Sequence, residues 1–142
     1  MKVRKKEFSL GKGNSLKVFL GGTCNSDTWR DRLIPMLDID YFNPVVDDWT
    51  EQDRINEIEE RKTCDIILYV ITPSMKGFYS IAEVVDDSNK RPEKTIFTIL
   101  GYEEFEDFQK KSLFAISDMV GSNGVEVFEN LRDTAEYINN LR

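Results

Sequence analysis

Short apolar runs alternate along the chain with longer segments in which apolar residues recur every three or four positions. The clearest run is Ile66-Ile67-Leu68-Tyr69-Val70-Ile71, whose residues are mostly β-branched or aromatic. Such a run is typical of a strand that is buried on both faces of a parallel sheet. Similar apolar runs predict four further strands, at residues 16–20, 41–46, 94–100 and 125–128.

The segments between these runs have helical periodicity. Within residues 27–37, Trp29, Leu33 and Leu37 recur at four-residue intervals, and Asp27 is a candidate N-cap. Pro35 falls inside this segment and is expected to kink or shorten the helix. The same periodicity predicts helices at residues 51–62, after Ser80, at 105–120 and at 131–141.

Strands and helices that alternate in this way indicate an α/β protein. Right-handed crossovers between parallel strands then build a doubly wound sheet of order 2-1-3-4-5, with helices on both faces. We find no repeat, linker or low-complexity segment within residues 16–142, which predicts a single domain. Residues 1–15 are basic and then glycine-rich, and are interpreted as a flexible lead-in or a short edge element.

Composition and net charge narrow the classes of function that this chain could have. The chain has 142 residues and a net charge of −7, which argues against a general nucleic-acid-binding protein, because phosphate neutralisation needs a basic surface. A small anionic ligand stays possible, since backbone N–H groups can hold a phosphate on an acidic protein. No signal peptide or long apolar run is present, so we expect a cytoplasmic protein without a membrane partner.

The chain contains no histidine and two cysteines, Cys24 and Cys64. Serine or cysteine catalysis with a histidine base is therefore excluded, as is every zinc site that uses histidine. Two cysteines are also too few for a structural zinc site. We predict no metal and no cofactor, so that any chemistry must rest on carboxylates, hydroxyls or amines.

Candidate ligand-binding residues follow the first strand. Gly21, Gly22 and Thr23 could let the backbone approach a ligand closely, or could simply form a tight turn. Trp29 could be a ligand platform, although its spacing also suits a core residue. Arg30 could lie in the crevice or be solvated.

Acidic residues follow the second predicted strand. Asp48 and the adjacent Trp49 could bind a sugar hydroxyl and a base, or belong to an acidic loop that caps the next helix. On that helix, Ile55 and Ile58 form the apolar stripe, and Glu57 lies beside them. Most of the charges on this helix are expected to be solvated.

The segment Ser80-Ile81-Ala82-Glu83 has two interpretations. Its S-x-x-E spacing is that of a capping box, in which the two side chains bond to each other's backbone. Alternatively, Glu83 lies where a helix begins at the ligand crevice, and the helix dipole keeps its carboxylate ionised. An ionised, desolvated carboxylate is a competent nucleophile towards an electron-poor sugar carbon.

Five short motifs, in this order and spacing, resemble the nucleoside 2-deoxyribosyltransferase-like family over roughly residues 16–100. They are Phe19-Leu20-Gly21-Gly22-Thr23, Trp29-Arg30, Phe42-Asn43-Pro44 with Trp49, Asp65 at the start of a buried strand, and Ser80-Ile81-Ala82-Glu83. The resemblance implies a flavodoxin-like fold and cleavage of the N-glycosidic bond of a deoxynucleoside or deoxynucleotide. It also implies that the partner is a small-molecule nucleoside or nucleotide, and that a homodimer is possible.

The resemblance assigns roles to individual residues. Glu83 would be the nucleophile that attacks C1′, and Glu57 would orient a sugar hydroxyl or protonate the departing base. Ser74 or Ser80 would hold a 5′-phosphate, together with the loop from Thr72 to Gly77. Gly77 stands where transferases of the family often carry an aspartate, a difference that bears on base exchange and on the use of free nucleosides.

Two other functions are compatible with these residues. A member of the family that has lost catalysis would bind and sense a nucleotide without cleaving it. A TIR-like domain has the same strand order and uses a glutamate to cleave the nicotinamide–ribose bond of NAD.

Overall fold

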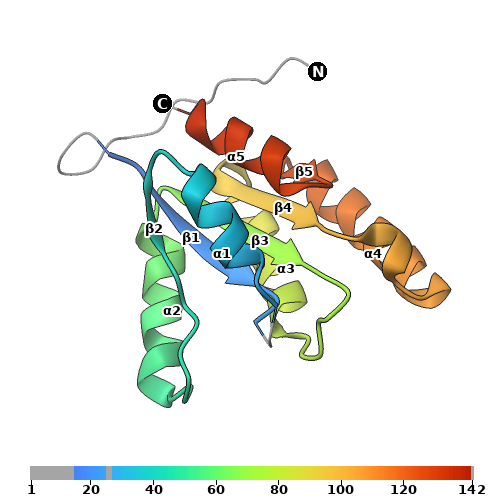
Figure 1. Cartoon of the computed structure of the whole chain (residues 1–142), viewed down its shortest axis with the longest axis horizontal. Coiled ribbons are helices and arrows are strands. Elements are labelled where there is room, and N and C mark those ends of the chain that lie inside the picture. The colour runs from blue at the N-terminus through green and yellow to red at the C-terminus, as the bar shows by residue number, and fades with distance from the viewer. Residues whose placement is uncertain (1–14, 25–26, 142) are drawn as a thin grey trace.

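The computed structural model describes residues 15–24 and 27–141, so the predicted lead-in lies outside the described residues except for Ser15. Five parallel strands form one sheet (Figure 1). They are β1 (Lys17–Gly22), β2 (Asp40–Phe42), β3 (Ile66–Ile71), β4 (Thr95–Ile99) and β5 (Glu126–Phe128). Their order is β2-β1-β3-β4-β5, which confirms the predicted doubly wound, flavodoxin-like arrangement.

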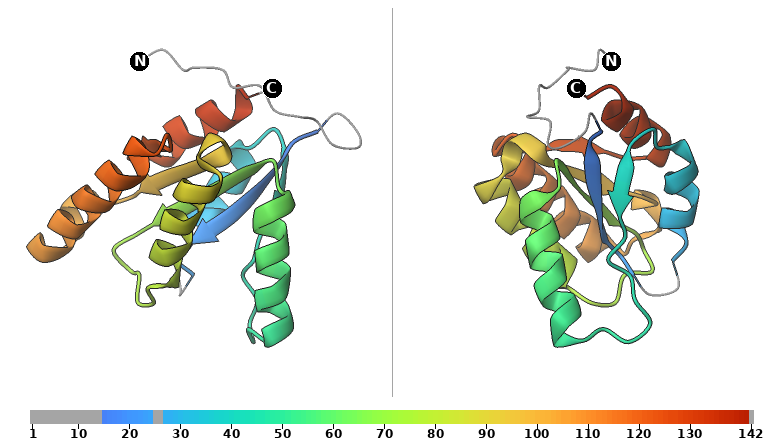
Figure 2. Two further views of the ribbon diagram at one scale, coloured as in Figure 1. Left: turned by 180° about the vertical axis from the view of Figure 1, so that it is seen from behind. Right: turned by 90° about the vertical axis from the view of Figure 1, so that its left-hand side faces the viewer.

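Helices cover both faces of this sheet (Figure 2). The α-helices are α1 (Trp29–Leu33), α2 (Glu51–Thr63), α3 (Tyr79–Lys90), α4 (Asp107–Ser122) and α5 (Leu131–Asn139). Three short 3-10 helices are η1 (Ile34–Met36), η2 (Pro92–Lys94) and η3 (Tyr102–Glu104). Helices α1 and α5 pack on one face, and α3 and α4 pack on the other.

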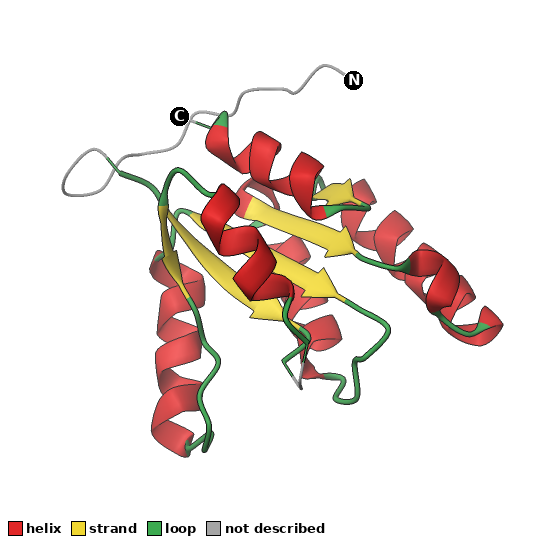
Figure 3. Cartoon of the chain, in the orientation of Figure 1, coloured by secondary structure: helices red, strands yellow, loops and turns green. Residues whose placement is uncertain are grey.

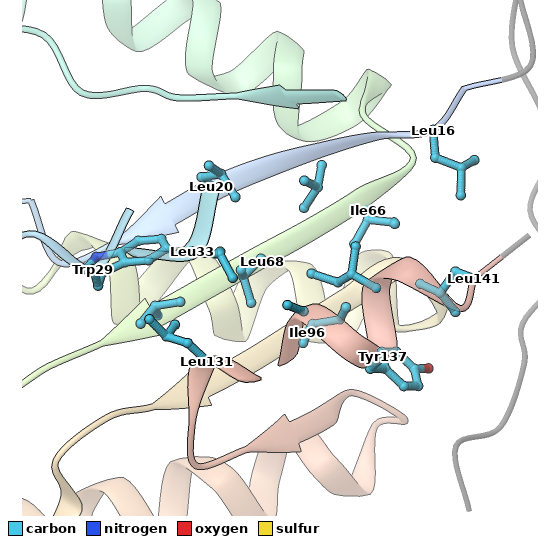
Figure 4. Packing of buried hydrophobic residues seen from close by; sticks show 14 residues of the cluster. Leu16, Leu20, Trp29, Leu33, Ile66, Leu68, Ile96, Leu131, Tyr137 and Leu141 are labelled. Carbon is cyan, nitrogen blue, oxygen red and sulfur yellow. The ribbon is translucent and has the colours of Figure 1, made fainter. Parts of the chain in front are cut away.

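The central strand β3 explains why both faces are apolar. Ile66, Leu68 and Val70 belong to the core under α1 and α5, whereas Ile67 and Ile71 alternate with them into the core under α3 and α4. Every residue of β3 is buried. The first of these cores is drawn in Figure 4, where side chains of α1 and α5 meet those of the strands.

Two predicted elements are wrong in extent. The second strand ends at Phe42 rather than at Val46, because Pro44 has no N–H to donate to a neighbouring strand and the Asn43 side chain accepts from Val45 N at 3.1 Å instead. The predicted helix 27–37 divides into α1 and η1, with Pro35 in the first turn of the 3-10 segment.

The loops that follow β1, β2 and β3 all leave the same edge of the sheet (Figure 3). This edge is formed by the carboxyl ends of parallel strands, where ligands of open α/β sheets bind. Helices α2 and α3 lie side by side next to it. None of the helices within the described ranges is long and apolar enough to cross a membrane.

Candidate active site

A cavity of about 600 Å³ lies at the carboxyl ends of β1 and β3. This volume is typical of small-molecule sites, which range from roughly 300 to 1,000 Å³. Its walls are formed by the end of β1, the loops that follow β1, β2 and β3, and the facing sides of α2 and α3. The lining residues are Gly21, Gly22, Thr23, Cys24, Arg30, Pro44, Val45, Val46, Trp49, Arg54, Glu57, Met75, Lys76, Gly77, Tyr79, Ser80 and Glu83.

The S-x-x-E segment does not form the capping box that its spacing allows. Helix α3 begins at Tyr79, its N-cap residue is Phe78, and no side chain makes a cap hydrogen bond there. Ser80 is therefore already inside the first turn, too late in the chain to act as the N-cap. The capping interpretation is wrong, and both Ser80 and Glu83 line the cavity instead.

Glu83 is the most unusual group in the cavity wall. Its residue is only 6% exposed. Its Oε2 atom is buried and makes no hydrogen bond with any residue in the described part of the chain. A buried, unsatisfied carboxylate oxygen is costly, and such groups are concentrated at functional sites.

Burial raises the pKa of the Glu83 carboxyl to about 7, although the nearby Arg61 guanidinium lowers it. The negative charges of Glu57, Asp87 and Asp86 raise this pKa further. The expectation that the helix dipole keeps Glu83 ionised is therefore wrong, because its pKa is raised rather than lowered. Desolvation is the larger effect, because the side chain lies one turn inside α3 and is closed off from water.

Glu57 lines the same cavity from α2. Its Oε2 accepts a hydrogen bond of 2.9 Å from the indole Nε1 of Trp49. Burial raises the pKa of Glu57, and the hydrogen bond from Trp49 opposes this rise. Two carboxyl groups with raised pKa values therefore face one cavity from neighbouring helices, an arrangement suited to acid–base or nucleophilic chemistry.

The glycines that end β1 lie against β3. Gly22 has a φ of 121°, and a Cβ built on it would lie 2.0 Å from Val70 O. Thr23 continues the contact, since its N–H donates to Val70 O at 2.9 Å. Glycine at position 22 is thus required by the close approach to β3, and the same residues line the cavity.

Arg30 and Trp29 hold this segment in place through side-chain hydrogen bonds to its backbone. The Arg30 side chain donates to Leu20 O at 3.0 Å and to Thr23 O at 2.7 Å, and is neither solvated nor free. Trp29 is fully buried and donates from Nε1 to Thr23 O at 2.8 Å. Arg30 still contributes to the cavity wall, whereas Trp29 belongs to the core and does not line the cavity.

Ser74 lies beside the cavity without lining it. Its hydroxyl donates to Asp27 Oδ2 at 2.8 Å, and Thr72 Oγ1 donates to the same oxygen at 2.6 Å. Burial acts to raise the pKa of Asp27, but these two hydrogen bonds, the one from Trp29 N and the charge of Arg32 together outweigh it, so that the pKa is lowered. Asp27 also accepts from Trp29 N at 2.9 Å and thereby connects the start of α1 to the loop after β3.

The two remaining predicted residues, Asp48 and Gly77, differ in whether they line the cavity. Asp48 is exposed and does not line the cavity, whereas the adjacent Trp49 does. Gly77 lines the cavity, and a Cβ built on it would meet no atom within 4 Å.

Sequence reasoning missed the residues behind Glu83. Arg61 of α2 is buried and lies 3.6 Å from Glu83 Oε2, and Asp87 of α3 is fully buried beside it. A signal was present, because Arg61 follows Glu57 by four residues and Asp87 follows Glu83 by four residues. Residues four apart lie on one face of a helix, so the members of each pair project in the same direction.

The two cysteines are free. Cys24 is exposed on the cavity wall, while Cys64 is buried, and burial raises the pKa of its thiol to about 12. Among the residues in the described ranges, no three His, Cys, Asp or Glu side chains are grouped so that they could hold a metal ion.

Comparison with known proteins identifies a family over the part of the chain that contains this site. The family model described as "Nucleoside 2-deoxyribosyltransferase like" matches residues 15–99, which is more than half of the chain. The matched segment includes the end of β1, Glu57 and Glu83. No curated protein sequence matches the chain. The chain therefore belongs to the nucleoside 2-deoxyribosyltransferase-like family.

Proposed function

We propose that this protein cleaves the N-glycosidic bond of a (deoxy)nucleoside or a nucleoside 5′-monophosphate, with Glu83 as the nucleophile and Glu57 as the acid. Water as the acceptor gives hydrolysis, and a second nucleobase gives 2-deoxyribosyl transfer. Family membership supports the substrate class, and the cavity volume of about 600 Å³ suits a nucleoside.

The observation that carries the proposal is the state of Glu83 Oε2. This oxygen is buried, has no hydrogen-bond donor among the described residues and lies 3.6 Å from the Arg61 guanidinium, in a residue that lines the cavity. A purely structural glutamate at such a depth would be expected to have its oxygens satisfied. A carboxyl group that lines the cavity and keeps lone pairs outside any hydrogen bond is instead what attack on a sugar carbon requires.

The proposed reaction has two steps. Glu83 attacks C1′, the C1′–N bond breaks, and its electron pair goes to the nitrogen of the base as Glu57 donates a proton. Water or another base then attacks C1′ of the glycosyl ester, releases the Glu83 carboxylate, and gives its proton to Glu57. The raised pKa of Glu57 favours the protonated form that a proton donor needs, and a pKa of about 7 leaves a substantial fraction of Glu83 ionised.

The outer part of the cavity suits the 5′ end of a substrate. Lys76 of the loop after β3 and Arg54 of α2 line the cavity, and Ser80 supplies a hydroxyl. Ser74 is less suited to phosphate binding than its sequence position implied, because its hydroxyl already donates to Asp27. A 5′-phosphate would therefore be bound through Ser80, Lys76 and the backbone N–H groups at the start of α3.

The test is product analysis with the Glu83→Gln variant. We expect the wild-type protein to release free base from deoxynucleosides or their 5′-monophosphates. The variant should lose this activity by on the order of 10³-fold or more, since an amide is not a competent nucleophile. Glu59→Gln is the matched control, because Glu59 is an exposed glutamate of the adjacent helix α2 and should leave the rate unchanged.

The panel should include NAD and a second free base. A new nucleoside would identify transfer, and release of nicotinamide would identify the TIR-like activity instead. A rise in melting temperature with a nucleotide but without product would identify a binding module, since binding to the folded state alone stabilises it. Equal rates for wild type and Glu83→Gln would refute the assignment of the nucleophile.

A further inference from the structure

Behind Glu83, one arginine connects α2 to α3. The Arg61 side chain donates from Nε to Asp87 Oδ2 at 3.1 Å and from one terminal nitrogen to Asp86 Oδ2 at 2.9 Å. Its other terminal nitrogen faces Glu83 Oε2 at 3.6 Å. Arg61 is only 7% exposed, so these three carboxyl groups form most of its polar surroundings.

The acid that anchors Arg61 is itself held firmly. Asp87 is fully buried and accepts a hydrogen bond of 2.6 Å from Tyr69 OH of β3. Its other oxygen is bonded by Arg91 at the end of α3. Because Asp87 is bound from three directions, the Arg61 guanidinium that it holds has one preferred orientation.

The two kinds of contact made by Arg61 differ in distance. Its bonds to Asp86 and Asp87 are ordinary charge-assisted hydrogen bonds, whereas 3.6 Å to Glu83 exceeds the usual range of roughly 2.7 to 3.2 Å. A separation of this size still gives a strong Coulomb interaction in a buried site. Glu83 therefore experiences the positive charge of Arg61 while the lone pairs of its Oε2 stay unoccupied.

The charges around Glu83 would otherwise favour its protonated form. Burial, Glu57 on α2, and Asp86 and Asp87 on α3 all oppose a negative charge there, and Arg61 is the cation that counters them. Tyr69 of β3 also faces this group, and burial raises the pKa of its phenol, so it remains neutral.

We propose that Arg61 is a positioning residue that favours the negatively charged form of Glu83 and leaves it available for attack, by acting on it through charge rather than through a hydrogen bond. This inference rests on the proposed function of Glu83. The alternative is that Arg61 only connects α2 to α3. The two explanations differ in what removal of Arg61 does to the titration of Glu83.

The experiment compares Arg61→Gln with Arg91→Gln. Both variants remove one arginine from Asp87, but only Arg61 faces Glu83. The titration of Glu83 is followed by carbon-13 NMR of its carboxyl group in each folded variant, which needs no activity. The pH profile of kcat/KM for base release is measured in parallel.

We expect Arg61→Gln to move the midpoint for Glu83 to higher pH by about one to three pH units, since an opposite charge at this distance has an effect of that size. The acidic limb of the pH profile should move with it, and kcat/KM at neutral pH should fall by about tenfold or more. Arg91→Gln should leave both midpoints near those of the wild type. Arg61→Lys keeps the positive charge, so its Glu83 midpoint should lie close to that of the wild type.

An unchanged Glu83 midpoint in folded Arg61→Gln would overturn the inference, as would equal displacements in Arg61→Gln and Arg91→Gln. These outcomes are distinct from failure of the proposed function. The wild type could release no base while the NMR midpoint still moves only in Arg61→Gln. That result would support the electrostatic role of Arg61 and refute the proposed reaction.

Discussion

At the scale of single residues, a hydrogen bond between two side chains of the cavity wall orients the candidate acid. The indole of Trp49 donates to Glu57 at 2.9 Å, although Trp49 itself is 52% exposed. An exposed tryptophan whose only polar atom is bound to a candidate acid can present its ring to a base and orient the acid at once. These two contributions can be separated by substitution.

Trp49→Phe should keep an aromatic ring and remove the hydrogen-bond donor. The pKa of Glu57 is expected to rise, because the donor that lowers it is lost, and the basic limb of the pH profile for base release should move to higher pH. A hydrogen bond between neutral groups contributes about 0.5–1.5 kcal/mol, so loss of the bond that orients the protonated Glu57 should lower kcat/KM by about 2- to 10-fold.

Trp49→Leu is the companion variant, since it removes both the donor and the ring. If Trp49→Phe has the pH profile and rate of the wild type while Trp49→Leu has a raised KM, the indole N–H has no part in orienting Glu57. The ring alone would then explain why Trp49 lines the cavity.

At the scale of elements, the site depends on how closely β1 and β3 approach each other at their carboxyl ends. Gly22 pairs with Val70 there, and its positive φ is a conformation that side chains other than glycine rarely adopt. Gly77, in the loop after β3, has no such constraint. The two glycines line the same cavity for different reasons.

Gly22→Ala is expected to destabilise the fold, because the added Cβ would collide with the Val70 carbonyl and the backbone is strained for alanine. The strain alone costs about 1–3 kcal/mol, and the collision adds to it. Denaturant unfolding measures the change. Gly77→Ala is the matched control and should leave the free energy of unfolding nearly unchanged; equal losses in both variants would contradict the argument.

At the scale of the whole molecule, the site and part of the scaffold lie on different faces of the sheet. Glu57 and Glu83 project from α2 and α3, whereas α1 and α5 cover the opposite face. Ile138 of α5 is fully buried in that opposite core. Stability and chemistry should therefore be separable in this protein.

Ile138→Ala is expected to lower the free energy of unfolding by about 2–5 kcal/mol through lost burial and a cavity. Base release per folded molecule should be unchanged when it is measured well below the melting temperature. A large loss of kcat in the folded variant would show that the core under α5 also determines the geometry of the cavity.

The sequence alone determined the order of the elements and the edge of the sheet at which the cavity lies. Runs such as Ile66–Ile71 and the periodicity of the helices depend on burial of neighbouring residues, which is a local property of the chain. For this reason Glu83 and Gly21 to Thr23 were predicted near the crevice, whereas Glu57 was assigned to the site through the family resemblance. The extent of β2 and the capping box were wrong, because both depend on where backbone hydrogen bonds end.

Only the tertiary structure decided the electrostatics of Glu83 and the roles of its neighbours. The pKa of about 7 results from desolvation and from charges on α2 and α3. Only the tertiary fold brings these charges together; Arg61 and Asp87, for example, are 26 residues apart in the sequence. The same is true of Trp29 and Arg30, whose polar atoms turn inward to the backbone after β1. Distances between side chains of different elements are set by packing, and no periodicity in the sequence encodes them.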